Sequence, residues 1–278
     1  MRRLAILIQG EPRFCTEFDQ FISSIQEYDQ VDWYFYLWKT SPATSFIVGH
    51  DGHNVVAPFW QNINNELAIE KLKKALPENH RVIRFEAVDQ GEVLVHQLTD
   101  NCAPETNQSN VWKMWYSLHK ANAMKIEYEQ SQNFKYDLVI RTRPDVALYG
   151  NISPESIMPR IERENNLVLI PGNKKCGYNG TWICDLVGIS TSDNMNIYTD
   201  LYNQALEHHS RGVKFHPETM LGRHLEHNQL RYESGDFTIE FRNLGTWHST
   251  VTGETWSGNA APDWNEDKIY TSIFGNWE

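Results

Sequence analysis

The sequence predicts a single α/β domain in which helices flank a mostly parallel β-sheet. Short apolar runs, of the length of strands buried on both faces, alternate along the chain with segments of helical periodicity. The chain also opens with a strand, a helix and a strand, which is the first unit of a parallel sheet. With 278 residues, 40% of them hydrophobic, the chain can bury a substantial core without disulfides or metal ions.

The first half of the chain carries most of the predicted sheet. Its first helix is indicated by apolar residues that share one helical face between Phe14 and Ile25. A later, longer helix has a stripe running from Val111 to Lys125, with Asn110 as the expected N-cap. The predicted strands cover residues 4–8, 31–38, 82–87 and 137–140, the predicted helices cover about 14–28, 66–75 and 111–132, and residues 40–65 and 97–110 are expected to be irregular.

The second half continues the same alternation before it becomes irregular. Strands are expected at residues 167–171 and 183–190, followed by helices at about 193–209 and 217–228, the latter with Pro217 in a favoured first-turn position. The C-terminal part is expected to be irregular. Its tryptophans either pack a loop onto the domain or offer platforms for sugar rings, and they are Trp247, Trp256, Trp264 and Trp277.

The charge of the chain argues against nucleic acid as a partner. The formal net charge is −11, from 25 basic and 36 acidic residues, and no run of Lys or Arg can follow a phosphate backbone or an anionic membrane. An anionic ligand would therefore need a local cluster of Arg and Lys, or a metal ion, to offset the field of the whole chain.

The sequence also predicts a cytoplasmic protein without a signal peptide or a transmembrane segment. The apolar stretch before Glu11 spans about five residues, whereas a signal peptide needs roughly 7–15 and a membrane helix needs ~20. The cysteines show no zinc-type spacing and are interpreted as free thiols in a reducing compartment, and they are Cys15, Cys102, Cys176 and Cys184. The cytoplasm in question is that of a bacterium or, for a viral protein, of its host.

The clearest functional signal is the segment YDLVIRTRPDV at residues 136–146. Arg141, Arg143 and Asp145 follow the buried strand at a spacing of two, so they point to one side. Pro144 has no N–H for the ladder, which places Asp145 just beyond the carboxyl edge, where open α/β sheets bind ligands. Two guanidiniums and a carboxylate there suit a diphosphate, with the carboxylate holding a divalent cation.

A structural interpretation explains the same residues equally well. In that interpretation Arg141 and Arg143 form ion pairs with acidic neighbours, of which Asp145, Asp137 and Glu127 are the candidates. Physical chemistry alone does not separate the two interpretations.

The same segment resembles the core of glycosyltransferase-like proteins of the GT-A type, in which an Arg-x-Arg-x-Asp phrase replaces the usual Asp-x-Asp. The opening strand LAILIQGEPR and the second strand DWYFYLW match this resemblance as well. It implies transfer of a sugar from a nucleoside-diphosphate sugar to a glycan or another hydroxyl acceptor. It also implies a GT-A-like fold, with a nucleotide-binding half at residues 1–150 and an acceptor-side half at 151–278.

The resemblance further implies a set of donor-binding residues. Gly10, Glu11 and Arg13 would line the nucleotide pocket, with Arg13 near phosphate, while Arg141, Arg143 and Asp145 would hold the diphosphate or its metal. The second aspartate of the usual motif is missing here, since Thr142 and Arg143 stand in its place. A divalent cation, Mn²⁺ or Mg²⁺, is therefore an optional rather than a required cofactor.

Two further carboxylates are candidates for catalysis. Glu218 lies in the first turn of a predicted helix and is the first choice for the base that takes a proton from the acceptor, although a carboxylate that complements the helix dipole explains it too. Asp185 interrupts an apolar strand and would bind the acceptor or the donor sugar, or else is a buried Asp satisfied by backbone donors.

Three histidines were candidates for metal chemistry. His224 and His227 do not form the HExxH motif of zinc proteases and are expected to be solvated on a surface helix. His248 is a candidate for one further metal ligand, because GT-A enzymes often supply a late histidine, with an ordinary loop histidine as the alternative.

Two other classes of protein compete with a glycosyltransferase. A glycoside hydrolase also needs two carboxylates, but no carboxylates are paired in the sequence and the arginines beside Asp145 favour phosphate over a neutral glycan. A non-catalytic carbohydrate-binding protein would use the Trp-rich C-terminal part and would not respond to nucleotides.

Overall fold

A computed structural model describes residues 1–11, 18–39, 65–104, 106–173, 175, 177–178, 180–241, 246–248 and 255–257. The strands are β1 (Arg3–Gly10), β2 (Gln30–Trp38), β3 (His80–Val88), β4 (Leu138–Thr142), β5 (Val146–Gly150), β6 (Leu167–Ile170), β7 (Gly188–Ser190), β8 (Arg231–Ser234), β9 (Phe237–Phe241), β10 (Thr246–His248) and β11 (Thr255–Ser257). The helices are α1 (Phe18–Ser24), α2 (Asn65–Ala75), α3 (Gln108–Gln132), α4 (Pro154–Arg163), α5 (Ser192–Thr199), α6 (Leu201–Ser210) and α7 (Pro217–His227), with a 3₁₀ turn, η2, at Gln90–Glu92.

The described residues form a seven-stranded, mostly parallel sheet in the order β3-β2-β1-β4-β7-β6-β8. Strand β1 pairs in parallel with β2 on one side and with β4 on the other. Strand β7 runs antiparallel to both of its neighbours, β4 and β6. The predicted mostly parallel sheet is therefore confirmed, with β7 as the exception. From β1 the sheet extends to β2 and β3 on one side and to β4 on the other, so the order of the strands reverses between β1 and β4. The carboxyl ends of these two strands therefore form the topological switch point, at which such sheets bind ligands.

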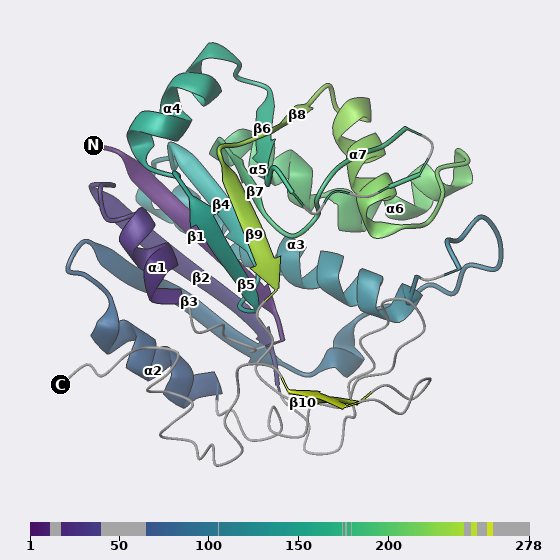
Figure 1. The fold of residues 1–278 in the computed structure, drawn as a ribbon, viewed down its shortest axis with the longest axis horizontal. Coiled ribbons are helices and arrows are strands. Elements are labelled where there is room, and N and C mark those ends of the chain that lie inside the picture. Colours follow the sequence, from purple (N-terminus) through teal and green to yellow (C-terminus); the bar gives the residue numbers. More distant parts are fainter. Residues whose placement is uncertain are drawn as a thin grey trace.

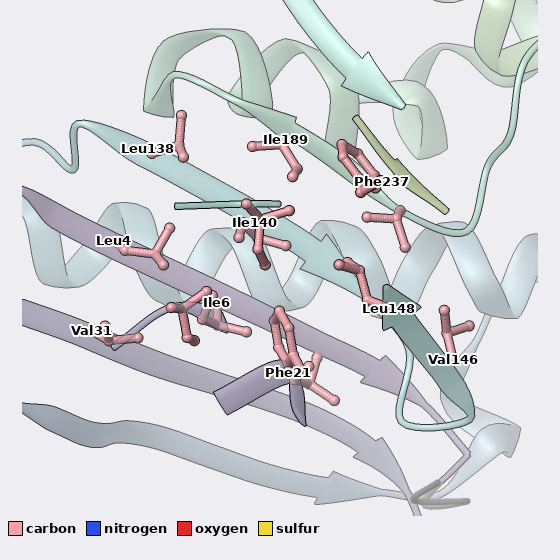
Figure 2. Close-up of a cluster of buried hydrophobic side chains, with 14 of the residues drawn as sticks. Leu4, Ile6, Phe21, Val31, Leu138, Ile140, Val146, Leu148, Ile189 and Phe237 are labelled. Carbon is pink, nitrogen blue, oxygen red and sulfur yellow. The ribbon is translucent and has the colours of Figure 1, made fainter. Parts of the chain in front are cut away.

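Helices cover both faces of this sheet. In Figure 1, α1 and the β5–β9 ribbon lie on the near side of the sheet, and α3 passes behind it. The near-side core takes Ile6 and Ile140 from the sheet, and Figure 2 shows Phe21, Val146, Leu148 and Phe237 packed over them. The far-side core takes Leu7 and Val139 from the same strands and packs them against α3, α5, α6 and α7. This alternation assigns each residue of β1 and β4 to one face.

A buried ion pair fastens α3 to α5 and to the start of β4. Lys125 donates to Glu129 (3.1 Å) and Asn196 (3.0 Å), and it also contacts the hydroxyl of Ser192. Glu129 accepts from Ser192 (2.6 Å) and from the backbone N–H of Tyr136 (2.9 Å). Burial lowers the pKa of Lys125, while Glu129 opposes that change. The charges are satisfied on all sides, which is the condition under which a buried pair is tolerated.

Several sequence-based boundaries were wrong. Helix α3 begins at Gln108, because the side chain of Asn107, not Asn110, caps it and accepts the N–H of Asn110 at 3.1 Å. The strand expected at 183–190 is only three residues long, so Asp185 lies in an irregular segment before β7. The helix expected at 193–209 breaks at Asp200.

The C-terminal part was expected to be irregular, yet β10 and β11 pair antiparallel there. Strand β5, helix α4 and strands β8 and β9 had no counterpart among the sequence predictions. The first helix is confirmed over 18–24 but ends earlier than predicted, with turns following from Ile25. Residues 12–17 and 40–64, which include Phe14 and the long loop, lie outside the described residues.

The fold places His224 and His227, which were both expected to be solvated, in different environments. His227 is exposed, but His224 is fully buried and its Nδ1 lies 3.0 Å from Nε2 of His208. Nε2 of His224 lies 2.7 Å from the carbonyl of Ile197, which can only accept, so Nε2 carries the proton and His208 donates to Nδ1. Both imidazoles are therefore neutral, and burial lowers the pKa of His208 to about 4.

Removal of one partner from the buried ion pair tests its contribution to stability. Lys125→Met leaves Glu129 buried without its cation, so we expect the free energy of unfolding to fall by about 3 kcal/mol in urea denaturation. The matched control is Lys135→Met, which removes an exposed ion pair with Asp193 and is expected to change stability by no more than about 0.5 kcal/mol. Equal losses in the two variants would contradict this assignment.

The histidine pair predicts a pH dependence of stability. The unfolded chain protonates His208 near its ordinary pKa of 6.5, whereas the folded chain does so only at about 4. Between these two pH values the unfolded state binds more protons than the folded state. The titration of His208 therefore lowers the free energy of unfolding as the pH falls from 6.5 to 4. We expect His208→Gln to flatten this part of the stability profile, and the exposed control His227→Gln to leave its slope unchanged.

Candidate active site

Arg141 is the central residue of the candidate site. It is the register partner of Leu7 in the β1–β4 pair, so its side chain lies on the α3 side of the sheet, close to the carboxyl end of both strands. The residue is 1% exposed, and its guanidinium makes no hydrogen bond or ion pair with any residue that the structure describes. Cζ of Arg141 lies over the ring of Tyr198, 5.7 Å from the ring centroid. A buried guanidinium in this state calls for an acceptor beyond the residues that the structure describes.

Gly188 makes room for the contact between Arg141 and Tyr198. It lies opposite Arg141 in the β4–β7 pair, and a Cβ atom on it would be 3.1 Å from Cε2 of the Tyr198 ring. Any larger residue would have to displace the ring. The close approach of ring and guanidinium therefore depends on a glycine at this position.

Asp185 faces the same small cavity as Arg141. It is 5% exposed and, within the described part of the chain, has no hydrogen-bond partner and no ion pair with Arg141 within 4.0 Å. The cavity is small and has room for about one ligand oxygen or one water. Its walls come from α3, α5, α6 and α7, and include Trp115, Leu118, Tyr198, Leu201 and Leu221.

Arg143 and Asp145 form a two-pronged ion pair beside this cavity. Nε of Arg143 donates to Oδ1 of Asp145 at 2.9 Å, and Nη2 donates to Oδ2 at 2.6 Å. Burial acts to lower the pKa of Arg143, but Asp145, and further off Asp185 and Glu11, raise it above its ordinary value. Arg143 thus keeps its charge and is near three of the predicted carboxylates. The structural interpretation is correct for this arginine, and the ligand interpretation remains for Arg141.

The end of β1 brings a second group of polar residues to the same edge. Gly10 has φ +105°, which favours glycine, and it turns the chain so that Glu11 meets the amide of Gln90. Lys113 of α3 donates to Oε1 of Gln90 at 3.0 Å. Gln9, 1% exposed, has neither of its amide atoms hydrogen-bonded among the described residues. The edge therefore offers a lysine and an unsatisfied amide in addition to the arginines.

Glu218 comes from the second half of the chain. It lies in the first turn of α7, as predicted, and its Oε2 is 3.4 Å from Nδ1 of His216. Burial raises the pKa of Cys184 to about 12, with a further increase from Asp185, a decrease from Arg141 and a smaller increase from Glu218. Because these three charges act on one thiol, the fold brings the predicted candidates together.

The described residues do not fit a divalent-cation site at Asp145. Both of its carboxylate oxygens accept from Arg143, so a metal ion would have to compete with a guanidinium. No group of three His, Cys, Asp or Glu residues with the arrangement of metal ligands occurs in the part of the chain that the structure describes. Arg13 lies outside the described residues, and so does the side chain of His248.

Sequence reasoning missed four residues of this site: Gln90, Lys113, Tyr198 and His216. Lys113 stands in the first turns of the long helix before β4, and its charge was the one signal that could have identified it. Gln90 and Tyr198 acquire their role from tertiary packing, for which a single sequence carries no period or spacing. His216 stands two residues before Glu218, and this spacing was visible in the sequence.

No family model matches the chain, and no curated protein matches its sequence. Among the described residues, no helix is both long enough and apolar enough to cross a membrane. The function is therefore argued from the site itself.

Removal of the unsatisfied guanidinium tests whether Arg141 is held for a ligand. We expect Arg141→Met to leave the free energy of unfolding unchanged or to raise it by about 1–3 kcal/mol, because an uncompensated buried charge is removed and its volume is kept. Urea denaturation without added ligand measures this. A loss of more than about 2 kcal/mol would mean that Arg141 has a structural partner in the native protein.

Proposed function

We propose that this protein is a glycosyltransferase that moves a sugar from a nucleoside-diphosphate sugar to a glycan or another hydroxyl acceptor. The observation that carries the proposal is the pair formed by Arg141 and Asp185. Both side chains are buried, both face one cavity, and neither has a hydrogen-bond partner among the described residues. A phosphoryl oxygen can accept from Arg141 and a sugar hydroxyl group can donate to Asp185, so a sugar phosphate has the groups that these two residues lack.

The positive groups at the edge suit a diphosphate. Arg141 supplies a buried charge, Arg143 a half-buried one, and Lys113 lies at the same edge through Gln90. The cavity admits one oxygen, so a phosphoryl oxygen reaches Arg141 while the rest of the diphosphate lies over the switch point. Because the net charge of the chain is −11, this local cluster of positive charge favours the binding of an anionic ligand here over the rest of the surface.

The same residues account for the transfer step. As the bond between the anomeric carbon and the diphosphate breaks, negative charge collects on the leaving oxygen, where a guanidinium that is already in place stabilises it. Asp185 orients the sugar by accepting from a hydroxyl group. Glu218, or the pair that it forms with His216, takes the proton of the acceptor.

This proposal includes no metal step. Arg141 provides the positive charge that a divalent cation would otherwise supply, since Arg143 and Asp145 are engaged with each other. The mostly parallel sheet is compatible with the resemblance to GT-A proteins, and we propose that fold type and its two halves together with the activity.

The two competing classes account less well for the site. A glycoside hydrolase binds a neutral glycan between two carboxylates and gives a buried, unsatisfied Arg141 no role. A non-catalytic carbohydrate-binding protein does not require the cationic edge. Both predict that nucleoside diphosphates leave the protein unaffected.

Nucleotide binding is the direct test. We expect one or more of UDP-, GDP- and dTDP-sugars to raise the melting temperature. Arg141→Met should weaken binding of that nucleotide by about 10–150-fold in calorimetry, the loss of a charged hydrogen bond worth roughly 1.5–3 kcal/mol. Arg160→Met, which removes an arginine from the opposite face at α4, is the matched control and should bind as the wild type does. The proposal fails if no nucleotide in the panel binds.

Chelation tests the assignment of charge to the arginines. We expect EDTA to change the affinity for the bound nucleotide sugar by less than about twofold, and added Mn²⁺ to have as little effect, because the described carboxylates do not form a cation site at Asp145. A tenfold loss of affinity in EDTA that Mn²⁺ restores would show that the diphosphate is held through a metal ion.

A further inference from the structure

We propose that the hydroxyl group of Tyr198 donates a hydrogen bond to the phosphoryl oxygen that Arg141 binds, so that a helix and a strand hold the diphosphate together. This inference rests on the proposed binding of a nucleoside-diphosphate sugar. It adds α5 to the donor site and gives a binding role to a residue that no motif in the sequence indicates.

The hydroxyl group of Tyr198 is a buried polar group without a partner. Tyr198 lines the same cavity as Arg141 and Asp185, and the residue is 1% exposed. Its hydroxyl oxygen has no hydrogen-bond partner among the residues that the structure describes. Thr199 lines the cavity as well, but its hydroxyl oxygen accepts from Asn122 at 2.9 Å. Because an unpartnered buried hydroxyl group is unfavourable, Tyr198, unlike Thr199, gains a missing hydrogen bond when a ligand supplies an acceptor.

The packing of Tyr198 against β7 brings this hydroxyl group to the level of Arg141 in the sheet. A Cβ atom on Gly188 would lie 3.1 Å from Cε2 of Tyr198 and 3.5 Å from its hydroxyl oxygen. Gly188 is the register partner of Arg141 in the antiparallel β4–β7 pair, and the Cα atoms of such partners are about 4.5–5.5 Å apart. The hydroxyl group therefore lies beside the strand position from which the Arg141 side chain extends.

The charges around the hydroxyl group favour a role as a donor beside Arg141. The guanidinium lies over the Tyr198 ring, within the roughly 6 Å at which a cation and an aromatic ring attract each other. Burial raises the pKa of the Tyr198 hydroxyl group, while Arg141 acts to lower it and Asp185 acts to raise it. The group therefore keeps its hydrogen at neutral pH. Among the charged groups, Arg141 has the largest effect on this pKa.

A phosphoryl oxygen is the acceptor that suits both donors. It is charged, and it can accept from a guanidinium and from a hydroxyl group at the same time. The cavity has room for about one oxygen, so Arg141 and Tyr198 must share the one that enters. Asp185 can only accept, and it therefore stays available for a hydroxyl group of the sugar.

The test compares the wild type with Tyr198→Phe in calorimetry, using UDP, GDP and dTDP and their sugar derivatives. The substitution keeps the ring, its contact with the guanidinium and its packing on Gly188, and it removes only the hydroxyl group. We expect binding of the nucleoside diphosphate and of its sugar derivative to weaken by the same factor, about 10–100-fold. A loss confined to the sugar derivative would place the hydroxyl group against the sugar and overturn the inference.

Stability without ligand gives an independent measurement. We expect Tyr198→Phe to leave the melting temperature unchanged or to raise it, because a buried hydroxyl group without a partner is removed. The matched control is Tyr28→Phe, in the core on the other face of the sheet, where the equally buried hydroxyl group donates to the carbonyl of Ile152 at 3.2 Å. Tyr28→Phe should lower the melting temperature by about 2–4 °C and leave nucleotide affinity unchanged.

The inference and the proposed function fail in different ways. If the wild type binds a nucleotide sugar and Arg141→Met weakens that binding, but Tyr198→Phe does not, only this inference is wrong. A fall in melting temperature for Tyr198→Phe as large as that for Tyr28→Phe would also contradict it, because the hydroxyl group would then have a partner within the protein. If no nucleotide binds to the wild type, the proposed function fails as well.

Discussion

The parallel pairing of β1 with β4 determines where the arginines of the site lie. Its register sets Arg141 opposite Leu7 and ends both strands at the same edge, so Gly10, Glu11 and Arg143 meet there. The apolar residues of the two strands alternate between two cores, and this alternation places the Arg141 guanidinium beneath α3 rather than in solvent. A shift of one residue would exchange the two faces and bury the charges in the wrong core.

Burial has opposite consequences for the charged groups of this protein. Lys125 and Glu129 are enclosed with every partner that they need, and they hold three elements together. Arg141 and Asp185 are enclosed to a similar degree, yet no hydrogen bond within the described part of the chain satisfies them. The first arrangement serves the fold, and the second leaves interaction energy that a ligand can use. That difference, more than the sum of charges, distinguishes the site from the rest of the interior.

The sequence predicted the elements whose pattern is long and unbroken, such as β1, β2 and α3. It did not predict β5, which begins two residues after Pro144, or α4, which has Pro154 at its start and Pro159 inside it. It also extended β7 over buried residues that lie outside the strand. For the site, spacing identified the two arginines but not their different states, since these depend on which acidic groups the fold brings near. The approach of Glu218 to His216 is local, because the two residues lie two positions apart at the start of α7, whereas the contact of Tyr198 with Arg141 joins α5 to β4, which are distant in the sequence.

The close approach at Gly188 has a consequence for how the affinity of this site can change. The strand opposite Arg141 has no side chain at that position, and the Tyr198 ring occupies the free space. A single added methyl group would press on the ring and, through it, on the guanidinium, without entering the cavity or altering any charge. The position of the Arg141 guanidinium can thus be adjusted from a neighbouring strand, by a small change of shape at a residue that carries no charge.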